Sequence, residues 1–370
     1  MNTTTRTVLA LAVLAMFPLN HVHGQANQGQ VAGRSEVEPE LAGLTSIDQV
    51  DALAATYFSQ DRIDKAIAAF EYAKTRFPAD LYTTIRRLTS LYASTKQYDK
   101  VMDTWELGQS RELFFMAESK LYEPLFQTER YRTFLVGNAR LLEEARKSAK
   151  AKYDVVLPDP FDPTREYPVF IVLHGNNINT AVMKPRWKLD TLAGSFVLVF
   201  LQSSQVTGSE SFIWDDLATG RRDVAGCYAW LQKNYRIDTT RVLIGGFSGG
   251  GGMAIDAAIR GVIPAKAFIA LCPGGVLPGR SDLAALKEAA GRSLVGQVIA
   301  GERDDPEEAK AFVALLSEAG VQVGLTVVPG LGHGFPADLP ARLDKAVGAV
   351  LEGARPAASP PTIPNSSTGP

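Results

Sequence analysis

A chain of 370 residues, 46% of them hydrophobic, can bury a large core and is long enough for more than one domain. Its formal net charge is −2 with no long run of one sign, which argues against nucleic acid or an anionic membrane surface as a partner. With only two cysteines and no zinc-ligand spacing, the sequence excludes a disulfide scaffold and offers no zinc site.

Residues 1–24 are predicted to be a secretory signal peptide. Arg6 supplies the positive charge near the start, and residues 7–19 form a hydrophobic core too short to span a bilayer. Cleavage is expected before Gln25, with a cut two residues later as the close competitor. An uncleaved anchor is disfavoured by the short apolar run. We therefore expect an exported protein, periplasmic or extracellular, without stable membrane insertion.

Residues 25–45 are polar and contain glycine, and we expect a flexible linker there; residues 46–150 are predicted to be helical. Within the helical region, large and small residues recur at an interval of 35 positions (88 − 53 for the first pair). The first unit contains Leu53, Ala54, Tyr57, Ala66 and Phe70, and the second contains Leu88, Thr89, Tyr92, Val101 and Trp105. A third, looser unit includes Tyr122, Leu125, Phe126, Tyr131 and Phe134.

This spacing resembles the tetratricopeptide repeat, whose large and small residues interlock two antiparallel helices. The match is good in the first unit, which closes with Pro78, and weaker in the second, where Thr89 and Val101 replace small residues. Because such repeats usually need about three or more units to bury their faces, we expect these to dock on the neighbouring domain. Two roles stay open: packing alone, or binding of a protein or peptide partner.

From residue 151 to 354 the pattern changes to short apolar runs separated by helical stretches. The expected strands are an edge strand at 153–157 and further strands at 169–173, 196–201, 241–246, 266–271, 296–300 and 321–328, with helices at 224–234 and 253–260. This alternation predicts an α/β fold with a mostly parallel sheet and helices on both faces, where ligands bind at the carboxyl ends of the strands. Residues 355–370, rich in Pro and Ser, are predicted to be a disordered tail.

The sequence Gly246-Phe247-Ser248-Gly249-Gly250 stands between a predicted strand and a predicted helix. Strand, Gly-x-Ser-x-Gly and helix together form the nucleophile elbow, in which the serine occupies a very tight turn. Side chains at the two outer glycines would collide across that turn. A phosphate-binding loop is the alternative, but the Lys-Ser/Thr ending of that motif is missing, so we favour a nucleophilic serine.

A serine nucleophile needs a base and a carboxylate that orients it. After removal of the signal peptide only two histidines are left, and of these His333 follows the last strand whereas His174 follows the first central one. The acidic loop after the penultimate strand offers Asp304, Asp305 and Glu302. The chain order is then serine, acid, histidine. The alternative for the acidic residues is a solvated loop.

The tetrahedral intermediate needs hydrogen-bond donors for its oxygen, each worth about 3–4 kcal/mol. The backbone N–H of Gly249, at the start of the helix, is one candidate. The loop after the first central strand supplies a second, for which Asn176 is the favoured donor. His174 is then a structural residue that shapes this loop.

Together, His174-Gly175, Gly246 to Gly250, Asp304 and Gly332-His333 resemble the α/β-hydrolase superfamily. Within it, the chain is most similar to bacterial-type secreted esterases of the polyhydroxybutyrate-depolymerase-like, feruloyl-esterase-like and phospholipase/carboxylesterase-like group. The resemblance covers residues 151–352, and the helical repeats lie outside it. It favours Asp304 over Asp305 as the acid, because in relatives the acid usually stands three residues after the strand-ending glycine.

The resemblance implies hydrolysis of a small-molecule or polymer-end ester, without metal or cofactor. Ser248 would form the acyl-enzyme and His333 would act as general base. A serine peptidase on the same fold is the runner-up, and a binding or scaffold protein that uses the helical repeats is the third hypothesis.

Three aromatic residues are candidates to line the acyl or alcohol pocket, with core packing as the alternative for each: Phe247, Trp214 and Trp187. Cys227 shares an apolar stripe with its neighbours and is interpreted as a core residue. Cys272 ends a strand near the candidate site. Whether the two cysteines pair is left open by the sequence.

Overall fold

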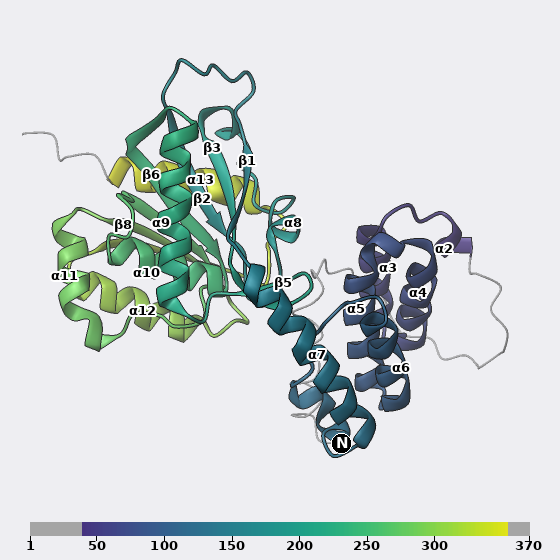
Figure 1. Ribbon diagram of the computed structural model, residues 1–370. Coiled ribbons are helices and arrows are strands. Elements are labelled where there is room, and N and C mark those ends of the chain that lie inside the picture. Colours follow the sequence, from purple (N-terminus) through teal and green to yellow (C-terminus); the bar gives the residue numbers. More distant parts are fainter. Residues whose placement is uncertain (1–38, 354–370) are drawn as a thin grey trace, which may run out of the picture.

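The computed structural model describes residues 39–353, in which a helical region is followed by a domain built on a central sheet (Figure 1). The predicted signal peptide, most of the predicted linker and the predicted tail lie outside these residues. None of the helices between residues 39 and 353 combines the length and the apolar character that crossing a membrane requires.

The helical region consists of consecutive helices that pack on one another, as the sequence predicts. Its elements are α2 (Pro39–Ala42), α3 (Ile47–Ser59), α4 (Ile63–Arg76), η1 (Pro78–Asp80), α5 (Leu81–Ser94), α6 (Tyr98–Gln109), η2 (Lys120–Leu125) and α7 (Glu129–Ser148). Helix α3 packs against α4, α4 against α5, and α5 against α6. The residues matched between the first two units are buried, except Leu53, which packs on the same cluster while partly exposed.

The matched tyrosines of the two units each donate a hydrogen bond to a glutamate. The hydroxyl of Tyr57 donates a hydrogen bond of 2.5 Å to Glu40, and the hydroxyl of Tyr92 donates one of 2.5 Å to Glu71. Both tyrosine rings are buried, so each phenol needs a partner at the rim of the helix pair. The tyrosines are 35 positions apart (92 − 57) and the glutamates 31 (71 − 40), so the acceptors do not share the repeat interval.

The sheet has seven strands in the order β1-β3-β2-β6-β7-β8-β9. They are β1 (Lys152–Val156), β2 (Tyr167–Leu173), β3 (Val197–Gln202), β6 (Ile237–Phe247), β7 (Ala267–Leu271), β8 (Val295–Gly301) and β9 (Gln322–Val328). Edge strand β1 is antiparallel to β3, and the other pairs are parallel. This confirms the α/β fold with a mostly parallel sheet. Strand β6 begins earlier than the predicted start at residue 241.

Helices cover both faces of the sheet because successive side chains of its buried strands point to opposite sides. Ile171 belongs to the core under α9 (Leu217–Asn234), α10 (Gly249–Ile259), α11 (Leu283–Gly291) and α12 (Pro306–Glu318). Its neighbour Phe170 belongs to the core under α8 (Thr180–Met183) and α13 (Leu339–Gly353). The short helices η3 (Ala193–Ser195) and η4 (Arg280–Asp282) complete the described helices.

Cys227 and Cys272 are both buried and both free, so the structure contains no disulfide between them. Cys227 lies on α9 and packs in the core between that helix and the sheet, and Cys272 packs in the core on the other face of the sheet. The central sheet therefore lies between the two cysteines.

A β-hairpin that the sequence pattern did not predict forms a contact between the helical region and the sheet domain. Strands β4 (Gln205–Gly208) and β5 (Ser211–Ile213) form a separate two-stranded sheet. Ser209 at its turn exchanges two hydrogen bonds with the backbone of Phe114, of 2.9 and 3.0 Å. Helix α7 packs against β4, and Figure 1 shows α7 running from the helical lobe toward this hairpin. The helical region thus docks on the sheet domain through β4 and β5.

The strand order reverses at β2, which fixes where a ligand site can form. The chain passes from β2 to β3 on one side, and later places β6 on the other side of β2. Leu173 pairs with Gly246 at the carboxyl ends of these strands. A reversal of this kind opens a crevice between the two strand ends, where α/β sheets bind ligands.

Asp256 ties α10 to its neighbours and provides a test of this packing. Its buried carboxylate accepts hydrogen bonds from Arg221 (2.7 and 2.8 Å) and Arg260 (2.8 Å). We expect Asp256→Asn to lower the free energy of unfolding by about 1–3 kcal/mol, since charge-assisted hydrogen bonds are lost. Urea denaturation measures the change.

The matched control is Lys310→Ala, which removes an exposed ion pair with Glu307. This variant is expected to lose less than about 0.5 kcal/mol. Equal losses in the two variants would contradict the proposed anchoring of α10.

Candidate active site

Ser248 stands at the turn between β6 and α10 with a backbone conformation that side-chain-bearing residues rarely adopt, φ 54° and ψ −126°. The turn is held by backbone hydrogen bonds: the Ser248 N–H donates to Leu271 O at 3.0 Å, and its carbonyl accepts from Gly252 and Gly274, each at 3.0 Å. The tightness explains the predicted Gly-x-Ser-x-Gly pattern.

The two outer glycines of the pattern have no room for a side chain. A Cβ on Gly246 would lie 2.6 Å from the carbonyl oxygen of Leu173, and one on Gly250 would lie 2.1 Å from that of His174. Both obstacles are backbone atoms of the β2 end, which cannot move aside cheaply. The glycines therefore allow the serine turn to press against the end of β2.

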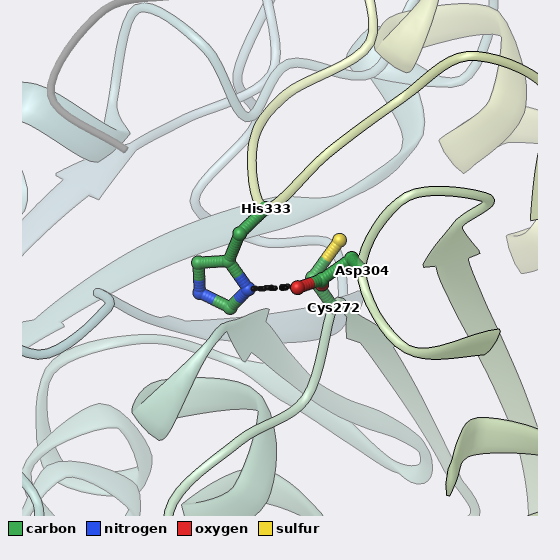
Figure 2. Close-up of side chains that lie close together, drawn as sticks. All are labelled: Cys272, Asp304 and His333. Carbon is green, nitrogen blue, oxygen red and sulfur yellow. Dashed lines mark hydrogen bonds and ion pairs between the residues drawn. The ribbon is translucent and has the colours of Figure 1, made fainter. Parts of the chain in front are cut away.

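The structure brings Ser248, His333 and Asp304 together in one hydrogen-bonded chain. The Ser248 Oγ lies 2.8 Å from Nε2 of His333, and Nδ1 of His333 lies 2.9 and 3.0 Å from the two carboxylate oxygens of Asp304. Figure 2 shows the His333 ring directed at Asp304, with Cys272 beside them. The three residues follow β6, β9 and β8, so the sheet supplies their common edge.

The neighbouring acidic residues have other partners. Asp305 caps α12, where its side chain accepts the N–H of Glu308 at 3.2 Å. Glu302 accepts the N–H of Gly330 at 2.7 Å. Of the three carboxylates predicted for this loop, Asp304 is the one that contacts His333.

Hydrogen bonding fixes the roles of the two ring nitrogens of His333. A carboxylate only accepts, so Nδ1 carries the proton toward Asp304, and Nε2 is left to accept the hydroxyl proton of Ser248. Burial raises the pKa of Asp304, but the hydrogen bond and charge of His333 and the thiol of Cys272 lower it by more, so the pKa lies below its ordinary value. Asp304 therefore stays negatively charged at neutral pH.

Cys272, Asp304 and His333 lie close enough for one ligand atom of each to fall within 4.8 Å of the others, a distance compatible with a metal ion (Figure 2). The donor chemistry fits poorly. Burial, followed by the charge of Asp304, raises the pKa of the Cys272 thiol to about 12, so without a metal the thiol is protonated and a metal would have to displace its proton. A metal would also displace the hydrogen bond between Asp304 and His333. The cluster is better suited to hold a proton.

His174 follows β2 and is fully buried, with both ring nitrogens occupied. Its Nδ1 lies 2.7 Å from the carbonyl oxygen of Gly175, and its Nε2 accepts from the N–H of Ser203 at 3.2 Å and from the amide of Gln202 at 3.0 Å. These partners require the neutral form. Burial lowers its pKa to about 4, against the opposing effect of the Gly175 carbonyl. The side chain shapes the loop, as the sequence predicts.

Residues 174–178 form the candidate oxyanion loop. The side-chain oxygen of Asn176 accepts the N–H of Trp214 at 2.9 Å, and its amide donates to Asp215 at 2.8 Å. A Cβ on Gly249 would lie 2.3 Å from the same oxygen, so the two predicted donor residues are in close contact. Within residues 39–353, the backbone N–H groups of Asn176 and Gly249 donate to no other group.

The three predicted aromatic residues occupy different places. Phe247 borders the site, with its ring centroid 5.0 Å from that of His333 and 4.3 Å from that of Phe335. Trp214 instead supports the loop, because its indole N–H donates to the carbonyl of His174 at 2.7 Å. Trp187 has no exposed surface and packs edge-on against Phe170. Its predicted contact with substrate is therefore wrong, and the packing alternative holds.

Two neighbours of the site escaped the sequence analysis. A Cβ on Gly274 would lie 3.8 Å from the Ser248 hydroxyl, so this glycine leaves open space beside the serine. Phe335 packs on Phe247. The pair Gly274-Gly275, three residues past the end of β7, was the available signal, since a glycine run near a strand end permits close approach to a ligand.

No protein-family model and no curated protein matches the chain. Among solved structures, an uncharacterized protein from Bacillus cereus is 23% identical, with 83% of this chain and 99% of that chain covered and a TM-score of 0.46. A ferulic acid esterase is 19% identical over 57% of this chain and 95% of that one, with a TM-score of 0.45.

A dipeptidyl peptidase 4 from Porphyromonas gingivalis is 18% identical over 55% of this chain and 33% of that one, with a TM-score of 0.43. At such identities and TM-scores, the likeness assigns neither a family nor an activity to this chain. Any function has to rest on the geometry of its own residues.

The buried, neutral His174 predicts a pH dependence of stability. Its pKa is about 4 in the folded protein and 6.5 ordinarily, so between these values the unfolded chain binds a proton that the folded one does not. Stability should fall as the pH drops from 6.5 to 4, with a contribution on the order of 3 kcal/mol. Urea denaturation of wild type and His174→Gln across this range tests it. Parallel curves for the two proteins would refute the assignment.

The reactivity of the two cysteine thiols provides a second test, because it reports whether both side chains are buried and protonated. Burial raises the pKa of both Cys227 and Cys272, so neither is a reactive thiolate at pH 8. We expect native protein to incorporate no iodoacetamide, and urea-unfolded protein to incorporate it at both cysteines, as read by intact mass. One equivalent taken up by the native protein would show that one of the two sites is open and ionised.

Proposed function

We propose that this protein is a serine hydrolase that cleaves carboxylic esters through an acyl-enzyme on Ser248. The observation that carries the proposal is the hydrogen-bonded chain from Asp304 through His333 to the Ser248 hydroxyl. A hydroxyl, a neutral imidazole that accepts its proton and a carboxylate that fixes the tautomer are the requirements of acyl transfer to serine.

In the first half of the reaction, the Ser248 oxygen attacks the ester carbonyl carbon while its proton passes to Nε2 of His333. Asp304 stabilises the imidazolium that forms and does not itself take the proton. The C–O bond to the alcohol then breaks, and the imidazolium returns the proton to the leaving alcohol. The product bound to the protein is a Ser248 ester.

The backbone N–H groups of Gly249 and Asn176 donate hydrogen bonds to the negative oxygen of the tetrahedral intermediate. Their close contact and lack of other acceptors within the described residues support this role. The N–H of Gly249 adds the positive end of the α10 dipole, which favours a negative charge near the first turn.

In the second half, a water molecule takes the place of the alcohol. Its proton passes to Nε2 of His333 as its oxygen attacks the acyl carbon, and the proton then returns to Ser248 as the acid leaves. Every proton is handled by one imidazole, so His333 has to be neutral at the start of each half-reaction.

Placement of residues 151–354 in the α/β-hydrolase superfamily belongs to the same proposal. It is supported by the elbow at a sheet edge, by the chain order of Ser248, Asp304 and His333, and by the strand reversal at β2. A tetratricopeptide-like origin of the helical region and export by the signal peptide are proposed on the sequence pattern.

Ester substrates are favoured over peptides because of what borders the serine. The described neighbours are Phe247, Phe335 and Gly274, which offer apolar surface and space. A peptidase that trims chain ends would need a charged group to hold the terminus. One cation beside these residues, Arg186, lies over the Phe335 ring with its guanidinium carbon 5.8 Å from the ring centroid, and it donates to the carbonyl of Val182 at 2.6 Å, so it is already engaged within the protein. Peptidase activity stays the runner-up, since both reactions pass through an acyl-enzyme.

A binding role of the helical region is a second candidate, and one observation favours it. A cavity of about 450 Å³ lies where this region meets the β4–β5 hairpin, and its lining includes Lys74, Tyr82, Arg111 and Glu210. Ser248, His333 and Asp304 are not among the residues that line it. A small ligand or a partner side chain bound there would sit apart from the proposed chemistry.

Labelling and turnover test the proposal. Wild type should bind one equivalent of a fluorophosphonate and hydrolyse short-chain aryl esters faster than the matching amides. Ser248→Ala should lose both properties, and Asp304→Asn should lower kcat by about 10³- to 10⁴-fold because the tautomer is no longer fixed. Intact mass and a chromogenic assay supply the measurements.

The control is Ser281→Ala, which removes an exposed serine and should leave labelling and turnover unchanged. Label that persists in Ser248→Ala, or a wild type inert to both reagents, would rule out the proposed nucleophile. Faster cleavage of amides would move the assignment to a peptidase.

A further inference from the structure

A side chain of the helical region, that of Arg86, forms a hydrogen bond with the candidate oxyanion loop. Arg86 lies on α5, and its Nη1 donates a hydrogen bond of 2.9 Å to the backbone carbonyl of Asn177. Asn177 directly follows Asn176, the proposed oxyanion donor. The bond joins residues 91 positions apart, one in the helical region and one at the carboxyl end of β2.

The residue that Arg86 holds has an unusual backbone conformation. Asn177 adopts φ 64°, in the left-handed region that asparagine tolerates better than most residues with a side chain. Its N–H donates to the carbonyl of Phe212 at 2.8 Å, and its carbonyl accepts from Arg86. Its buried side-chain oxygen has no hydrogen-bond partner among the described residues, so the side chain adds no polar anchor. The two backbone bonds therefore carry the support.

Both hydrogen bonds of the Asn177 backbone connect it to the helical region, one directly and one through the β4–β5 hairpin. Phe212 belongs to β5, whose hairpin is held at its turn by the two hydrogen bonds between Ser209 and Phe114. Tyr82 of α5 contacts the same hairpin, because a Cβ on Gly208 would lie 2.2 Å from the tyrosine hydroxyl. Arg86, one turn further along α5, lies over the Tyr82 ring with its guanidinium carbon 5.8 Å from the ring centroid.

We propose that Arg86 is a positioning residue for the candidate oxyanion loop. Its hydrogen bond fixes the chain immediately after Asn176, and so directs the Asn176 N–H toward the place where the substrate oxygen becomes negative. The proposal rests on the proposed ester-hydrolase function. It makes the helical region a part of the catalytic apparatus, since Asn177 would lose one of its two backbone hydrogen bonds without Arg86 of α5.

Three variants of the full-length protein test this role. Arg86→Ala removes the bond, and Arg86→Lys keeps one donor for the Asn177 carbonyl. Arg87→Ala is the matched control, because Arg87 also lies on α5 but pairs with Asp51 inside the helical region, at 2.9 Å. Each variant is compared with wild type in kcat, KM, affinity for a trifluoromethyl ketone that forms a tetrahedral adduct, and hydrogen exchange of residues 174–178.

Arg86→Ala is expected to lower kcat by about 10- to 100-fold, since a misplacement of about 1 Å at a reacting centre has effects of this size. Affinity for the ketone should fall in parallel, while KM stays within about twofold, because the lost interaction acts in the transition state. Exchange of the loop amides should accelerate. Arg86→Lys should recover part of each effect, and Arg87→Ala should show none of them.

Two results would overturn the proposal. One is unchanged loop exchange in Arg86→Ala, and the other is a loss of kcat no larger than that of Arg87→Ala. Failure of the proposed function would look different: wild type itself would neither turn over esters nor bind the ketone. The exchange measurement needs no substrate, so it decides whether Arg86 positions the loop in that case too.

Discussion

The turn at Ser248 is the constraint on which the rest of the site depends. Its left-handed backbone holds the hydroxyl above the edge of the sheet, and three backbone hydrogen bonds from neighbouring segments maintain it. The glycines on either side let the turn press against the end of β2, within reach of the candidate oxyanion loop. Because β6, β8 and β9 run in the same direction, their carboxyl ends place the serine, the acid and the imidazole along the same edge of the sheet.

The two described histidines show how their surroundings decide the chemistry of one residue type. His174 is buried in the core, and the N–H donors on its Nε2 require the neutral ring. His333 is part-exposed, with one nitrogen on a carboxylate and the other on a hydroxyl. The first arrangement fixes a loop, and the second can take up and release a proton. Burial separates a structural imidazole from a candidate base.

Local patterns in the sequence predicted the features that neighbouring residues determine, namely the strands and the serine turn. Continuous apolar runs gave the parallel strands, and the glycines around Ser248 gave the elbow. Contacts between distant segments were beyond such patterns. The β4–β5 hairpin is short and was missed although Gly208-Ser209 marks its turn, and Trp187 was placed at the site when its fully buried ring belongs to the core. Arg86 carries no local signal, because its partner lies 91 residues away.

Direct observation of the covalent intermediate tests the central claim. Wild-type protein mixed with p-nitrophenyl butyrate, quenched in acid within milliseconds and digested, is analysed by peptide mass spectrometry. The account predicts a butyryl group on the peptide that contains Ser248, which appears at the rate of nitrophenol release and disappears once substrate is exhausted. Nitrophenol release without an acyl group on Ser248, or with one on another residue, would contradict it.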